Sequence, residues 1–119
     1  MMKVVFIEDE QPWLPHPRAK DVKIKYLIPK SELNENTICL LVKIPRGAEV
    51  PTHSHECQSD ILYPLYGRFK MWIEGIGEIE VKKGMIVRIP RGVKHKVYDV
   101  QEDSLIINVF STSLLLDVT

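Results

Sequence analysis

The sequence is poor in several features that would assign it to other classes of protein. It contains only two cysteines, Cys39 and Cys57, which are too few for a disulfide framework and are expected to be buried or half-buried side chains in a reducing compartment. Lysine plus arginine and aspartate plus glutamate number 16 each, so the chain lacks the basic excess that nucleic acid requires. No apolar run reaches the roughly 18 residues of a membrane span, and no small-residue cleavage site follows the apolar start. These absences predict a cytoplasmic protein that binds neither nucleic acid nor membrane.

Helical periodicity is also missing. Instead, nine or ten short apolar or alternating segments are separated by turns rich in Gly, Pro, Asp and Asn, as in an all-β sandwich or barrel. At 119 residues the chain is expected to form one domain, with an N-terminal strand and Pro-rich loop over 1–20 and a barrel over about 21–119. The expected strands are Val4–Ile7, Asp21–Ile28, Thr37–Ile44, Ile61–Tyr66, Phe69–Ile73, Glu78–Val81, Met85–Ile89, the segment that begins at His95, Leu105–Phe110, and an edge strand in the tail 111–119.

Some of these segments carry finer expectations. The alternation over Asp21–Ile28 predicts one buried face and a wet, charged face that includes Lys25. The nearly continuous apolar run Thr37–Ile44 predicts a strand covered on both faces. Gly67 is expected in the turn of a hairpin, and Pro64 just before it indicates an edge position or a bulge.

The four histidines are the best candidates for chemistry. His53 and His55 are separated by one residue, so on an extended chain both side chains point to the same side. If Asp60 and His95 come in from neighbouring strands, three imidazoles and a carboxylate meet, a ligand set that suits Mn, Fe, Zn, Ni or Cu. His16 lies in the Pro-rich loop and is expected to be an exposed loop histidine without a role in this site.

The candidate ligands lie within two segments of regular spacing, 47–67 and 84–99. Both segments resemble the paired motifs of the cupin superfamily, small β-barrels that often hold a metal. Asp60 stands where that family usually has Glu, and Asp99 stands where it usually has Asn. The positions that match are Gly47, His53, His55, Gly67, Gly84, Pro90, Gly92 and His95.

This resemblance implies a cupin-type double-stranded β-helix, a jelly-roll barrel, with one divalent transition metal bound by His53, His55 and His95. Asp60 is expected to be a weak ligand, because its carboxylate ends one methylene, roughly 1.5 Å, short of where Glu would reach. Gln58 shares its sequence parity and is either a substitute ligand or a donor that orients an imidazole. Further expected pocket residues are Leu62, Pro64, Phe69, Met71, Val97, Asn108 and Phe110, whereas Arg88 and Tyr98 are expected on the outside.

Such a pocket is apolar with few charges, which suits an aromatic or enol-type substrate better than a phosphorylated sugar. Open coordination positions on the metal indicate a metal-dependent oxidoreductase of dioxygenase type acting on a small organic molecule. The alternative is a non-catalytic module that binds a small molecule or a metal. Because Thr37–Ile44 and Val4–Ile7 have more apolar faces than one small barrel can cover, we also predict a homodimer.

Overall fold

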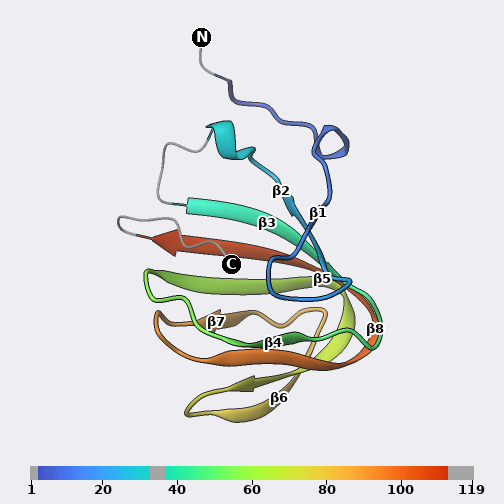
Figure 1. Cartoon of the computed structure of the whole chain (residues 1–119), viewed down its shortest axis with the longest axis vertical. Helices are drawn as coiled ribbons and strands as arrows, with labels where there is room; N and C mark the ends of the chain where they lie inside the picture. Colours follow the sequence, from blue (N-terminus) through green and yellow to red (C-terminus); the bar gives the residue numbers. More distant parts are fainter. Residues whose placement is uncertain (1–2, 33–36, 113–119) are drawn as a thin grey trace.

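The computed structural model describes residues 3–32 and 37–112, and its strands form one antiparallel sheet that curls around a buried interior (Figure 1). The all-β prediction is therefore confirmed. Two single-turn 3-10 helices, η1 (Glu8–Glu10) and η2 (Lys30–Glu32), precede β3, and within the described ranges no helix has the length and apolarity needed to cross a membrane. The strands are β1 (Leu14–Pro15), β2 (Lys23–Tyr26), β3 (Thr37–Ile44), β4 (Val50–His53), β5 (Gln58–Ile73), β6 (Gly77–Lys82), β7 (Val87–Ile89) and β8 (His95–Thr112).

Two long strands, β5 and β8, form the centre of the sheet. The strand order is β1-β2-β3-β8-β5-β6, with β4 paired to β8 and β7 paired to β5. In Figure 1 both long strands bend as they cross the molecule, so each contributes to both ends of the curled sheet. Among the described residues there are eight strands and not nine or ten: each long strand replaces two of the predicted short ones, whereas β1 and β4 were not predicted.

The hairpin predicted around Gly67 is wrong, because β5 continues through this position without a turn. Gly67 has φ +104°, and a Cβ built there would lie 2.1 Å from Ser104 Oγ and 2.5 Å from Ser104 Cα. Glycine is therefore required for the close approach of β5 to β8. The register of this pair shifts several times between Pro64 and Lys70, as expected where two strands bend together.

The position of Pro64 agrees with its predicted role. Its partner on β8 is Ile106, and a register shift follows directly. On the other side of β5, β7 pairs as far as Leu62 and β6 pairs from Arg68 onward, so Pro64 falls in the stretch between the two partners. A residue without a backbone N–H is tolerated at such a place.

The core is a single apolar cluster, to which β3 contributes alternate side chains from one face. The prediction for Thr37–Ile44 is only partly confirmed, because Leu41 is buried on the second face while Cys39 is half-buried and Lys43 is exposed. The largest fully buried apolar side chains are Phe69, Ile38, Leu40, Ile44, Met71, Ile89 and Ile106.

The predicted strand Val4–Ile7 is also wrong: this segment is not a strand in the structure, and Val4 is 71% exposed. The chain instead passes through η1 and then pairs with β2 through the short β1. The segment 111–119 belongs to β8 up to Thr112, and the rest of the predicted tail strand lies outside the described residues.

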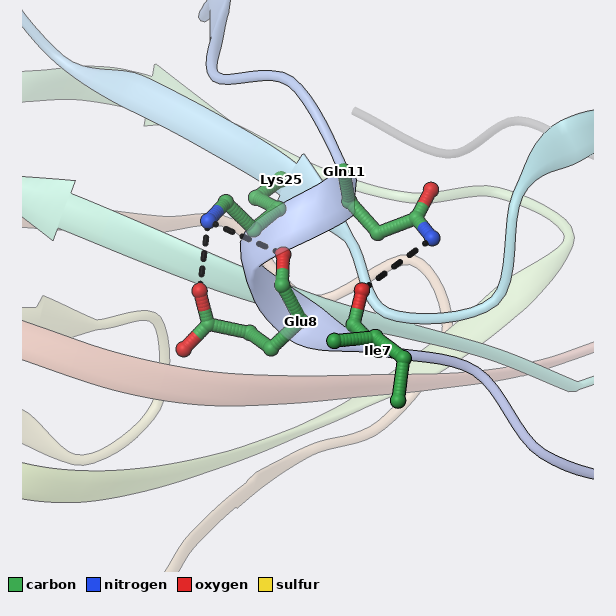
Figure 2. A network of polar contacts seen from close by, with 4 residues as sticks. All are labelled: Ile7, Glu8, Gln11 and Lys25. Atoms are coloured by element: carbon green, nitrogen blue, oxygen red, sulfur yellow. Dashed lines mark hydrogen bonds and ion pairs between the residues drawn. The ribbon is translucent and has the colours of Figure 1, made fainter.

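Lys25 was expected on the wet face of its strand, but its side chain is buried under the N-terminal segment. Its Nζ donates to Glu8 Oε2 at 2.5 Å and to the Glu8 carbonyl at 3.3 Å, as Figure 2 shows next to the contact of Gln11 with Ile7. The same ammonium lies 4.6 Å from the centre of the Trp13 ring, and Lys43 Nζ lies at the same distance from that ring. Trp13 is therefore the packing anchor that holds this segment on β2 and β3.

Candidate metal centre

Three histidines, two from paired strands and one from the connection after β4, line one cavity. His53 ends β4, His95 begins β8, and the two are direct partners in the pairing of these strands. His55 follows in the connection to β5. Their ring centres are 4.3 Å (His53 to His95), 4.9 Å (His53 to His55) and 5.4 Å (His55 to His95) apart. One ligand atom from each residue can be chosen so that all three lie within 4.8 Å of one another.

Backbone carbonyls orient two of these rings. His53 Nδ1 is 2.7 Å from the Pro51 carbonyl, and His95 Nδ1 is 3.0 Å from the Val93 carbonyl. Since a carbonyl can only accept, each Nδ1 carries the proton and each Nε2 presents its lone pair. This arrangement is the usual support of a metal-binding imidazole.

The unpaired nitrogens also fit a metal. His95 Nε2 and both ring nitrogens of His55 are buried and have no hydrogen-bond partner among the described residues. Leaving buried polar atoms unpaired costs stability, and a cation held by the three rings would satisfy one nitrogen of each. The donor set is therefore that of a site for a divalent transition metal ion.

The electrostatics keep these imidazoles neutral. Burial lowers the pKa of His55 to about 3, with further lowering from the nearby His53, His95 and Arg18. Burial likewise lowers the pKa of His95 to about 4 and that of His53, although the carbonyl that accepts from each ring opposes the shift. Neutral imidazole is the form that binds a metal, so the site is ready for one at neutral pH.

Asp60 lies beside the three rings without joining their group. Its Oδ2 is 3.9 Å from His95 Nε2, and its Oδ1 accepts a hydrogen bond of 3.0 Å from Asn108 Nδ2. Burial raises the pKa of this carboxyl to about 7, although the bond from Asn108 lowers it. The pairing of Asp60 with Asn108 was not foreseen, since it depends on the register of β5 against β8.

The cavity walls agree with only part of the predicted lining. Leu62, Val97, Asn108 and Phe110 line the cavity, together with apolar residues from β2, β3, β4 and β8. Gln58, Pro64, Phe69 and Met71 were also expected there, but they are buried in the core and are not among its lining residues. Phe69 and Met71 are on the buried face of β5, but they pack in the apolar core and not against the cavity.

Three other residues singled out in the sequence lie off the cavity wall. Gln58 is fully buried, and neither polar atom of its amide has a partner among the described residues. Arg88 is exposed, and Tyr98 is half-buried with its hydroxyl donating to the carboxylate of Glu78. Neither of these two side chains lines the cavity, as expected.

The sequence interpretation was wrong about His16, which is half-buried and lines the cavity with the other three histidines. The backbone N–H of Arg18 donates to His16 Nδ1 at 3.0 Å. Burial lowers the pKa of His16 to about 4, and the nearby His53 and Arg18 lower it further. The only signal in the sequence was a histidine between two prolines, Pro15 and Pro17, which restrict the loop but do not show where it folds.

A small antiparallel β-barrel with three converging imidazoles defines a class of metal-binding barrel proteins. The model of the Cupin domain family matches residues 40–110, which include all three histidines of the site, and the chain belongs to this family. Both the resemblance and the cupin-type fold predicted from the motifs are therefore confirmed.

Individual relatives extend the match beyond the motifs. The chain is 29% identical over 110 residues to the pectin degradation protein KdgF of Dickeya dadantii (strain 3937), covering 92% of this chain and 94% of that protein. It also resembles the structure of KdgF from Halomonas sp., with a TM-score of 0.76, 27% identity, and coverage of 93% of this chain and 96% of that one. A predicted oxalate decarboxylase from Thermotoga maritima shares the fold, with a TM-score of 0.77, 22% identity, and coverage of 92% and 100%.

Proposed function

We propose that this protein is a metal-dependent enzyme that acts on a small uronate, the acidic type of sugar from which pectin is built. The observation that carries the proposal is the similarity to two KdgF proteins, 29% and 27% identical over more than nine-tenths of the chain, one of which is named for pectin degradation. The three-histidine site lies within this matched length and supplies a place for chemistry.

The reaction class that fits best is the redox-neutral opening of an unsaturated uronate ring. Such a sugar is a cyclic enol ether, which agrees with the enol-type substrate indicated by the apolar lining. In this step the anomeric hydroxyl loses its proton, the bond from the anomeric carbon to the ring oxygen breaks, and the ring oxygen gains a proton as an enol. The enol then becomes a ketone, as its O–H proton is lost and the far carbon of the C=C bond gains a proton, which removes the conjugated double bond. Atoms and electrons balance without an oxidant.

The residues of the cavity have distinct tasks in this proposal. His53, His55 and His95 hold the metal, which when bound acts as a Lewis acid on a substrate oxygen. Asp60 is the buried carboxyl of the cavity, with a pKa of about 7, and can hold or accept a proton at Oδ2 while Asn108 occupies its Oδ1. The apolar walls exclude water from the reacting atoms.

The test loads the protein separately with each candidate metal, Mn, Fe, Zn, Ni or Cu, and measures bound metal by elemental analysis. We expect close to one ion per chain, and loss of the absorbance of the conjugated double bond when unsaturated galacturonate is added, without oxygen uptake. The double variant His53→Ala/His95→Ala should lose both metal and activity, whereas Arg88→Ala, on the exposed side of β7, should keep both. A fully loaded protein that leaves the substrate unchanged with every metal would overturn the proposal.

A second candidate is oxygen-dependent chemistry of dioxygenase type. The observation that favours it is the neutral donor set of three imidazoles beside an apolar cavity, which leaves coordination positions for substrate and oxygen. Oxygen uptake with catechols, flavonols, thiols or β-diketones would support it over ring opening. Binding of a small molecule without turnover would instead support the non-catalytic alternative.

We also propose a cytoplasmic setting. Cys39 and Cys57 are both free thiols and both half-buried, which suits a reducing compartment. Detection of the native protein in the cytosolic fraction, with both thiols titratable after unfolding, tests this location.

A further inference from the structure

We propose that His16 is a substrate-positioning residue, whose Nε2–H donates to an oxygen of an anionic ligand in the metal cavity, and that Arg18 beside it favours the ligand's carboxylate. The inference deepens the proposed function, because it explains how a metal site with apolar walls would select an acidic sugar. It rests on that function only for the identity of the sugar.

The ring of His16 is fixed in one tautomer. The backbone N–H of Arg18 donates to Nδ1, so in the neutral imidazole the proton lies on Nε2, at the other side of the ring. Burial is the main reason that this ring stays neutral, and His53 and Arg18 nearby also disfavour a positive charge on it. His16 is thus a neutral hydrogen-bond donor among the residues that line the cavity.

The loop that carries His16 is held in place along its length. Before it, Leu14 and Pro15 pair with β2, and the backbone N–H of His16 donates to the Val22 carbonyl at 2.9 Å. Further back, Glu8 is bound by the buried Lys25, as Figure 2 shows. A donor on a fixed segment loses little conformational entropy when it binds a ligand.

Arg18, two residues beyond His16, carries a charge of the right sign for an anion. The walls are apolar apart from the imidazoles, Asp60 and Asn108, so no lining side chain carries a permanent positive charge. The backbone N–H of Arg18 bonds to the His16 ring, and its positive charge helps to lower the pKa of His16, His53, His55 and His95. A carboxylate entering the cavity gains from this charge, and a neutral sugar does not.

The experiment compares binding of D-galacturonate and of the neutral D-galactose to metal-loaded protein by isothermal titration calorimetry. In His16→Phe, which keeps a ring without a donor, and in Arg18→Gln, we expect about tenfold weaker binding of galacturonate, the loss of one hydrogen bond or ion pair to a charged group. His16→Gln retains a donor and should recover part of the affinity. Lys20→Gln removes an exposed charge two residues beyond Arg18 and is the matched control, with unchanged binding. Metal content, measured by elemental analysis, should be equal in all variants.

The outcomes separate this inference from the proposed function. With unsaturated galacturonate as substrate, His16→Phe and Arg18→Gln should raise KM about tenfold and change kcat much less. Turnover with an unaltered KM in both variants would overturn the inference and leave the function standing. No turnover, but a preference for galacturonate that both variants lose, would overturn the function and leave the inference standing. Equal binding of galacturonate and galactose by the unaltered protein would also overturn the inference.

Discussion

Asp60 is the cavity residue at which this chain departs from the cupin pattern, since a Glu is usual there. The carboxylate is directed to Asn108 at 3.0 Å and to His95 at 3.9 Å, so it lies close to the rings without being grouped with them. A shorter side chain therefore places a negative charge near the metal site while leaving coordination positions open.

We predict that Asp60→Ala weakens metal binding about tenfold, the lower end of effects from groups that support a ligand. Asp60→Glu should bind metal more tightly but turn over more slowly, because its longer side chain reaches a coordination position that substrate needs. Competition with a chromogenic chelator measures both affinities. If Asp60→Ala lost metal as completely as His95→Ala, Asp60 would be a direct ligand and the prediction would be wrong.

In the metal-free protein, the buried histidines and Asp60 are expected to change the stability in opposite directions as the pH rises. His55 and His95 have pKa values of about 3 and 4 when folded against 6.5 ordinarily, so the unfolded chain binds more protons and stability is lost as the pH falls below about 6.5. Asp60 has a pKa of about 7 when folded against 3.8 ordinarily, so the folded protein binds more protons and stability declines as the pH rises toward 7. Stability should therefore be greatest slightly below neutral pH.

Asp60→Asn tests this account, because it removes the buried charge and keeps an acceptor for Asn108. At about pH 8 we expect the metal-free variant to exceed the unaltered protein by about 2 kcal/mol in free energy of unfolding, measured by urea denaturation. Below about pH 4, where both side chains are neutral, the difference should vanish. If the free energy of unfolding of the two proteins varied in the same way with pH, Asp60 would not be a buried carboxyl with a raised pKa.

At the level of strands, the site depends on the crossing of β5 and β8. One end of β8 supplies His95 and a later part supplies Asn108, while β5 supplies Asp60, so both bends must be correct for these groups to meet. Gly67 allows the two strands to approach at the bend.

We predict that Gly67→Ala destabilises the protein by about 3 kcal/mol or more, because positive φ and overlap with Ser104 both oppose a Cβ. Gly75→Ala is the matched control: it also has a positive φ, +84°, but the methyl group would enter open space, with no contact within 4 Å beyond its chain neighbours, so only about 1 kcal/mol should be lost. Thermal or urea unfolding measures both. Equal losses in the two variants would show that the crossing is not tightly packed.

For the whole molecule, exposed apolar side chains support the proposed homodimer. Val4, Val5 and Ile7 are 71%, 66% and 50% exposed, and the outer face of β5 adds Tyr63 and Tyr66 at 41% and 48%. Such patches usually mark interfaces. Light scattering at micromolar concentration should give about twice the 13.8 kDa chain mass, and Val4→Asp/Val5→Asp should shift the population toward monomer. A monomer mass for the unaltered protein would exclude the dimer.

The grouping of His53, His55 and His95 was predictable from the resemblance of their spacing to the cupin motifs, although His95 meets the other two only through the pairing of β4 with β8. The all-β class likewise followed from alternation and turn residues, which are properties of neighbouring positions. Tertiary structure decided what depends on segments distant in sequence. The N-terminal segment folds over β2, which buries Lys25 and brings His16 to the cavity, and Phe69 packs in the core and not in the cavity wall. Local sequence patterns do not encode these contacts. The contacts depend on which strands cross and how closely, which is determined by side-chain packing between segments distant in sequence.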